Sequence, residues 1–184
     1  MKDVFDVQDE IAKAIAGWLR VTLGDDPGSL PRVIRHTENQ EAYHLYLRGR
    51  HHWYSRNRGG LQKALRYFEQ AVEKDPEYPV PWVGLSDLYT VQAIYGYERE
   101  VELRPKATVA IERALSLNDQ LGDTHRALGF VQMFFDWDLK AAARSFERSI
   151  ELDPSSSLSH AWLGWASMWP GRKDAAIAAA SSAA

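Results

Sequence analysis

The sequence predicts an all-α protein, a solenoid of stacked antiparallel helix pairs with one extra amphipathic helix at its N-terminus. The first observation is a motif, Ala-x3-aromatic or aliphatic-x2-small, that recurs at a nearly constant period. Its copies begin at Ala64, Ala107, Ala142 and Ala176, which lie 43, 35 and 34 residues apart. The second is the helical spacing of apolar residues from residue 40 onward, with no convincing run of strand alternation. A fixed period of this length is typical of stacked supersecondary units.

The N-terminal segment 4–23 reads as an amphipathic helix. Its apolar residues fall three and four apart and share one stripe: Val7, Ile11, Ala14, Ile15, Trp18 and Val21. Glycine and proline in 24–39 indicate a linker. We therefore divide the chain into a helix in 1–23, a linker in 24–39 and a repeat array in 40–184. An isolated helix of this length is marginal in water, so we expect it to pack on the repeats of its own chain or of a second copy.

Composition excludes several classes of protein. The 184 residues include no cysteine, which excludes disulfides, thiolate metal sites and a cysteine nucleophile. The net charge of −3 gives no general attraction for nucleic acid or anionic membranes. No apolar run approaches the ~20 residues of a membrane span. Because acidic residues such as Asp3 and Asp6 stand where a signal peptide would be basic, we expect a cytoplasmic protein.

Each copy of the motif has a physical role in the stack. In the copy at Ala64, the small residue lets a neighbouring helix come close, and Phe68 fills the space between helix pairs. Pro76 ends the helix because proline cannot continue it. The third copy repeats the arrangement with Ala142, Phe146 and Pro154.

These residues resemble the tetratricopeptide repeat, whose pattern is W-x2-L-G-x2-Y…A-x3-F…P. The stretch 82–89 reads Trp-x2-Leu-Ser-x2-Tyr, and 128–129 and 163–164 both read Leu-Gly. The resemblance covers about 40–184 and implies a right-handed superhelix with three complete repeats and a truncated fourth. The second repeat carries nine extra residues, which we place between its helices around Tyr95–Pro105.

Certain bacterial signalling proteins have a C-terminal region that this sequence resembles in DVFDVQDEIAKAIAGWLRVTLG, EAYHLYLRGRHHW, FFDWDLKAAARSFERSIELDP and HAWLGWA. In those proteins an adenylate or guanylate cyclase domain, or a winged-helix DNA-binding domain, precedes a TolB-like segment and tetratricopeptide repeats. The resemblance implies that the chain is a fragment of such a regulator or a relative that lacks the output domain. Nothing in 1–184 resembles a cyclase core or a winged helix, so neither activity carries over.

The resemblance also implies a concave groove, lined by the first helix of each pair, that receives peptides. Its lining would be Tyr46, Arg50, Trp53 and Tyr54, then Asp87, Thr90 and Val91, then Arg126, Phe130, Met133 and Phe134, and last Trp165, Met168 and Trp169. Such a groove is aromatic and Met-bearing, which suits an apolar or amphipathic helix. The Lys/Asn set that clamps a C-terminal carboxylate in some family members is missing, which argues against chaperone tails as ligands. The alternative is that some of these side chains are core between adjacent helices.

A basic segment occupies 42–68. It contains six Lys or Arg residues, interleaved aromatics, and neither Asp nor Glu. One interpretation is a surface for an acidic peptide, a domain of the same protein or single-stranded nucleic acid. The interpretation that we favour is a solvated helix face paired with Glu69, Glu73 and Glu77.

Candidate catalytic and metal sites are weak. His44 lies about 10 Å along a helix from His51, too far for one ion to bridge. Asp136 and Asp138 flank Trp137 at a turn, where carboxylates commonly cap the next helix. We expect no enzyme activity, no metal and no cofactor.

The sequence thus predicts a non-catalytic scaffold that binds a protein or peptide. The alternative is a structural dimerisation module that holds together the cyclase or DNA-binding domains of a longer parent protein. Nucleic-acid and membrane partners are not expected.

Overall fold

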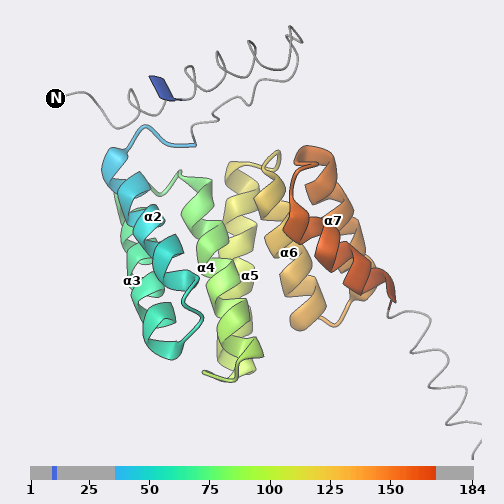
Figure 1. Cartoon of the computed structure of the whole chain (residues 1–184). Coiled ribbons are helices and arrows are strands. Elements are labelled where there is room, and N and C mark those ends of the chain that lie inside the picture. The colour runs from blue at the N-terminus through green and yellow to red at the C-terminus, as the bar shows by residue number, and fades with distance from the viewer. Residues whose placement is uncertain (1–9, 12–35, 169–184) are drawn as a thin grey trace, which may run out of the picture.

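The computed structural model describes residues 10–11 and 36–168, and the described part is helical, without strands (Figure 1). Its helices are α2 (Gln40–Trp53), α3 (Arg58–Lys74), α4 (Pro79–Ile94), α5 (Glu100–Leu117), α6 (Gly122–Phe134) and α7 (Leu139–Leu152). A further helical stretch covers 157–168. Most of the expected N-terminal helix and linker, and the chain beyond 168, lie outside the described residues.

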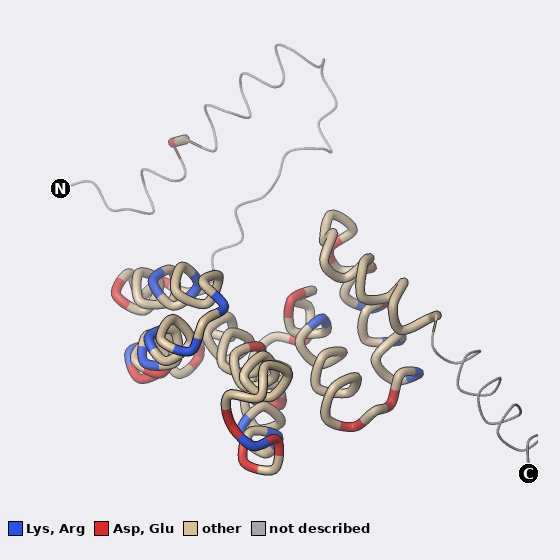
Figure 2. The backbone as a smooth tube through the Cα atoms, turned by 60° about the horizontal axis from the view of Figure 1, so that its bottom comes forward, with Lys and Arg blue, Asp and Glu red and all other residues tan. Residues whose placement is uncertain are grey.

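Consecutive helices pack as pairs, α2 with α3, α4 with α5 and α6 with α7. Between pairs, α4 packs on α2 and more extensively on α6, whereas α3 and α5, like α5 and α7, hardly meet. The row of first helices is therefore the shorter side of a curve, and the second helices splay on its outer side. Figure 2 shows the pairs following one another along this curve. The all-α solenoid that the sequence predicts is confirmed.

Side-chain caps begin several helices. The Oδ1 atoms of Asn39, Asn57 and Asp138 accept hydrogen bonds from backbone N–H groups of the first turns of α2, α3 and α7, at 3.0, 2.8 and 2.9 Å. These bonds satisfy N–H groups that have no partner inside the helix. Helix α4 begins instead with Pro79, whose ring fixes the helical φ and whose missing N–H costs nothing there.

Two buried phenylalanines set the distance between helices. Phe68 and Phe146 are both fully buried. A Cβ atom at Gly129 would lie 2.5 Å from Cε1 of Phe146, and one at Gly49 or Gly84 would also meet the ring of Phe68. Only glycine lets the backbone come so close, so α2, α4 and α6 pack directly onto the rings.

The extra residues of the second repeat do not form the loop that the sequence suggests. Helices α4 and α5 have 16 and 18 residues, against 13 and 14 in α6 and α7. Most of the insertion therefore lengthens the two helices, and only 95–99 separates them. Pro105 lies inside α5, where its missing N–H leaves the carbonyl of Val101 without a helical partner. Water can reach that turn, because Val101 is 65% exposed.

Candidate functional site on the inner face

We call the surface formed by α2, α4, α6 and 157–168 the inner face, because these first helices form the shorter side of the curve. Twelve of the fourteen predicted groove residues lie in described helices of this row, Tyr54 directly follows α2, and Trp169 lies outside the described residues. Six of them are buried, namely Tyr46, Trp53, Asp87, Thr90, Arg126 and Met133. Their side chains therefore belong to the packing between helices. Four are half-buried (Arg50, Val91, Phe130 and Phe134), and three are exposed (Tyr54, Trp165 and Met168).

The centre of the inner face is a buried ion pair. The guanidinium of Arg126 on α6 donates to both carboxylate oxygens of Asp87 on α4, at 3.0 and 2.7 Å, and its Nε donates to Asp123 at 3.0 Å. The side chains of Arg126 and Asp87 are only 6% and 9% exposed. Burial lowers the pKa of Arg126, but the two carboxylates more than offset it, so the pKa is raised. The arginine therefore stays charged and joins two successive repeats.

Toward α2 lies what we call the arginine–tyrosine cluster, formed by Tyr46, Arg50, Trp53, Tyr54 and Arg56. Arg50 donates to the hydroxyl oxygens of Tyr46 and Tyr54, each at 2.7 Å. The guanidinium carbon of Arg56 lies 3.5 Å from the centroid of the Trp53 ring. Both contacts hold a cation against an aromatic side chain.

Toward the C-terminus lies the aromatic cluster, which we define as Phe130, Phe134, Trp162 and Trp165. The Trp162 ring centroid is 5.2 Å from that of Phe130 and 5.6 Å from that of Phe134, both edge to face. Trp165 follows at 6.1 Å from Trp162 and is 47% exposed. Such edge-to-face contacts are favourable beyond their buried area. The cluster thus presents a rigid apolar surface on the inner face.

The two clusters are linked through the ion pair. Arg126 lies over the ring of Phe130, with its guanidinium carbon 5.3 Å from the centroid. At the other end, burial lowers the pKa of Arg56, an effect that the charge of Asp87 opposes and that of Arg126 adds to. The inner face is therefore cationic at α2 and aromatic at 157–168, with the buried ion pair between the two ends.

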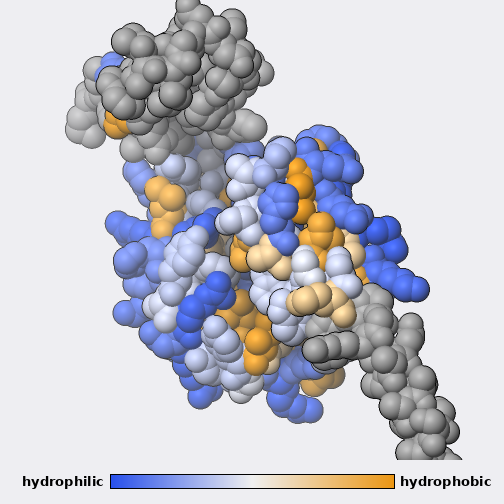
Figure 3. All heavy atoms as spheres, turned by 45° about the vertical axis from the view of Figure 1, so that its right-hand side comes forward, coloured by the Kyte–Doolittle hydropathy of each residue, from blue (hydrophilic) through white to orange (hydrophobic). Residues whose placement is uncertain are grey.

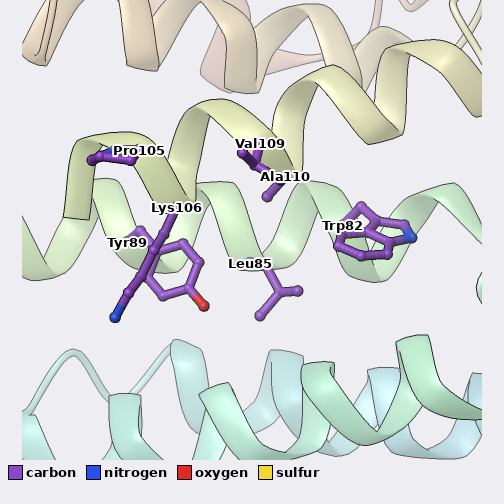
Figure 4. Close-up of a pocket in the computed structure, with 7 residues that line it drawn as sticks. All are labelled: Trp82, Leu85, Tyr89, Pro105, Lys106, Val109 and Ala110. Carbon is purple, nitrogen blue, oxygen red and sulfur yellow. The ribbon is translucent and has the colours of Figure 1, made fainter. Parts of the chain in front are cut away.

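A separate apolar pocket opens on the opposite side of α4. Trp82, Leu85 and Tyr89 lie in a row along α4, and α5 contributes Pro105, Lys106, Val109 and Ala110 (Figure 4). The volume is about 330 Å³. Between the splayed helices α3 and α5, Leu85 stays buried, whereas Trp82 and Tyr89 are left half-buried. The side of the molecule that carries α7 also shows several separate apolar patches among hydrophilic side chains (Figure 3).

The basic segment differs from the sequence interpretation. In the described part of the chain, none of its six Lys and Arg residues pairs with Glu69, Glu73 or Glu77, and three of the arginines lie over aromatic rings instead. Figure 2 shows the Lys and Arg positions grouped on the α2–α3 pair. Arg48 lies over Tyr67, Arg50 over Tyr46 and Tyr54, and Arg56 over Trp53.

The two aspartates flanking Trp137 have separate structural roles. Asp138 caps α7, as expected, and Asp136 accepts a hydrogen bond from Arg104 at 2.6 Å. Among the residues that the structure describes, no three His, Asp or Glu side chains are placed to hold a metal ion. Nor is any described helix both long and apolar enough to cross a membrane.

Three residues of the inner face were not predicted as site residues. Trp162 lies three residues before Trp165, so helical spacing could have placed both on one face. Arg56 belongs to the basic segment, but its position over Trp53 depends on a backbone φ of 52°, which no sequence pattern indicates. Asp123 lies three residues before Arg126 and is a helical partner at ordinary spacing.

No protein-family model matches the chain, and no curated protein matches it either. Solved structures do match. The NMR structure of the first TPR domain of the human RPAP3 protein has a TM-score of 0.59 at 18% identity, covering 74% of this chain and 97% of that one. The first TPR of Spaghetti (RPAP3), bound to the HSP90 peptide SRMEEVD, has a TM-score of 0.54 at 20% identity, covering 72% and 95%. The chain therefore has the fold of tetratricopeptide-repeat domains.

Proposed function

We propose that the chain is a non-catalytic interaction module that binds a peptide or a partner domain on its inner face. The observation that carries the proposal is the row of contacts on the inner face from Arg126 over Phe130 and Trp162 to the exposed ring of Trp165. Aromatic and arginine side chains are the residue types that dominate binding energy at protein interfaces. The solved TPR of Spaghetti was determined with a peptide bound, which supports a peptide as the kind of ligand.

The proposed setting is a larger cytoplasmic bacterial regulator, with the array in 40–184 as its interaction domain. The proposed occupants of the inner face are a peptide of another protein, the N-terminal segment 4–23 or a second copy of the chain. Apolar residues of the ligand would lie on the aromatic cluster, where the exposed ring of Trp165 provides the contact area.

Peptide selection tests this proposal. A displayed random-peptide library is selected on the immobilised chain, and the affinity of an enriched peptide is measured by calorimetry. We expect Phe130→Ala/Trp165→Ala to weaken binding by tenfold or more, because truncation of an aromatic anchor removes about 2 kcal/mol or more. The matched control is Trp137→Ala, which removes a ring that is 76% exposed at the α6–α7 turn. Equal affinity of both variants would contradict the proposal.

The second candidate is a dimerisation module that holds together the catalytic or DNA-binding domains of a longer parent protein. It is favoured by Leu158 and Met168, which are 42% and 64% exposed on the last described helix, because exposed apolar residues of this kind can form a contact with another molecule. Light scattering over a range of concentrations separates the two. A constant monomer mass excludes the dimer, and a constant dimer mass that falls with Met168→Glu supports it.

A further inference from the structure

Arg50 and Arg56 carry positive charge on the inner face that no described carboxylate neutralises. Asp87 and Asp123, two carboxylates of the inner face, are both bound by Arg126. Within the described residues neither arginine forms an ion pair. Asp87 and Asp123 therefore pair with Arg126 alone, and the charges of Arg50 and Arg56 at the α2 end of the face have no ion-pair partner among the described residues.

The guanidinium of Arg50 is fixed in orientation. Its two terminal nitrogens donate to the hydroxyl oxygens of Tyr46 and Tyr54, and its carbon lies 5.8 and 5.3 Å from the two ring centroids. Its Nε is buried and has no hydrogen-bond partner. The two tyrosine hydroxyls hold the guanidinium of Arg50 in place without neutralising its charge. A guanidinium held in this way loses little side-chain entropy when it binds a carboxylate or a phosphate.

The position of Arg56 has a conformational cost. Its φ of 52° lies in the left-handed region, which is uncommon for a residue other than glycine. This conformation lets the guanidinium stack on the ring of Trp53, and Tyr97 donates a hydrogen bond to the Arg56 carbonyl at 3.3 Å. Backbone strain that the surroundings maintain is found at binding and active sites more often than elsewhere. A stacked guanidinium keeps its N–H edge available for an acceptor.

Two exposed tyrosine rings border this end of the face. Tyr54 is 61% exposed and Tyr95 is 47% exposed. Both are near enough to act on the pKa of Arg56, which burial lowers and these groups counter. The cationic groups are therefore surrounded by aromatic surface that a ligand can contact.

We propose that Arg50 and Arg56 bind an oxyanion of the partner polypeptide, next to Tyr54. The oxyanion is the carboxylate of an acidic side chain or the phosphoryl group of a phosphorylated one. This inference rests on the proposed function and specifies its ligand: a segment with an anionic group for the α2 end of the inner face and apolar residues for the aromatic cluster. The charge that Asp87 and Asp123 leave unmatched is then neutralised by the ligand.

The test uses three small probes that share one ring: phenyl phosphate, phenylacetate and benzyl alcohol. Each is titrated into the full chain at constant ionic strength while the arginine side-chain N–H signals are followed by NMR. We expect saturable shifts of the Arg50 and Arg56 signals with at least one anion and none with benzyl alcohol. Tighter binding of phenyl phosphate identifies a phosphorylated partner residue, whereas comparable binding of phenylacetate identifies an acidic one.

Substitutions then test whether Arg50 and Arg56 bind the anion. Arg56→Gln should weaken anion binding about tenfold or more, since a charge-assisted hydrogen bond contributes this much. The matched control is Arg148→Gln, which removes an arginine of α7 paired with Glu151 and should leave binding unchanged. Arg50→Lys keeps the positive charge but loses the planar guanidinium group. Circular dichroism checks that this variant is folded. If that variant does not fold, Arg56→Gln alone decides.

Equal shifts with benzyl alcohol, or equal anion affinity of Arg56→Gln and Arg148→Gln, would overturn the inference. Neither result affects the proposed function, which is tested separately through Phe130 and Trp165. Conversely, anion binding that survives Phe130→Ala/Trp165→Ala, together with selected peptides that ignore those residues, would retain the anion site and reject the apolar half of the face.

Discussion

Arg126 on α6 and Asp87 on α4 form a bidentate ion pair across 39 residues of sequence, with both hydrogen bonds buried. The pair joins the first helices of the second and third repeats at the centre of the inner face. A buried pair adds little net stability compared with apolar residues of the same size, but removal of one partner leaves an uncompensated buried charge. The pair therefore determines how the two repeats are placed more than how stable they are.

The first prediction concerns this pair. Asp87→Leu leaves Arg126 with only the half-exposed Asp123, and we expect a loss of about 3–5 kcal/mol in the free energy of unfolding. The double variant Asp87→Leu/Arg126→Met removes both charges and should recover most of the loss. Urea denaturation followed by circular dichroism measures both. The exposed pair of Arg148 and Glu151 is the control, since its disruption should cost less than about 1 kcal/mol.

The second prediction compares two glycines at equivalent positions of successive repeats. Gly129→Ala would place a Cβ 2.5 Å from the ring of buried Phe146, and overpacking of this kind costs about 1–3 kcal/mol. At Gly164 the described residues leave open space, so Gly164→Ala should stabilise the helix by up to about 1 kcal/mol. Thermal unfolding of the two variants should move in opposite directions. A shift of the same sign in both would contradict the packing described for Gly129.

The third prediction concerns alkaline pH. Burial raises the pKa of Tyr46 to about 12, against an ordinary value of about 10, and Arg50 opposes the shift only in part. Because the folded chain holds this proton more tightly, the stabilisation is complete below pH 10 and is lost as the pH rises from about 10 to about 12. Denaturation at a series of pH values measures the decline. In Tyr46→Phe the decline should be shallower, though Tyr78, whose pKa burial also raises, still contributes. An unchanged pH dependence would contradict the assignment to Tyr46.

The sequence was sufficient for the fold because the fold depends on local, periodic signals. Ala64, Ala107 and Ala142 are buried as the repeat requires, as are Phe68 and Phe146, and Asp138 caps its helix. The way in which the second repeat accommodates its extra residues was not predictable in the same way. Proline usually breaks a helix, yet Pro105 lies inside α5, where water can reach the preceding turn at Val101.

The candidate site was predictable in its elements but not in its accessible residues. Helical spacing places Asp87 and Thr90 toward the inner face, but neighbouring helices of the row cover them, so they are buried. Such covering depends on how closely α4 approaches α2 and α6, which glycine contacts with Phe68 and Phe146 determine. The aromatic partners of the arginines could not be predicted from the sequence either. A basic segment next to glutamates suggests ion pairs, yet Arg50 and Arg56 lie over aromatic rings of the first helix pair instead.

The most direct test of the central claim is the affinity ratio between two tryptophan variants for a peptide selected on the intact chain. The claim is that ligands bind to the inner face, so Trp165→Ala should weaken binding by tenfold or more relative to Trp137→Ala. Both rings are substantially exposed, so neither substitution removes a core residue. A ratio near one, with both variants folded, would show that ligands bind elsewhere and would contradict the account.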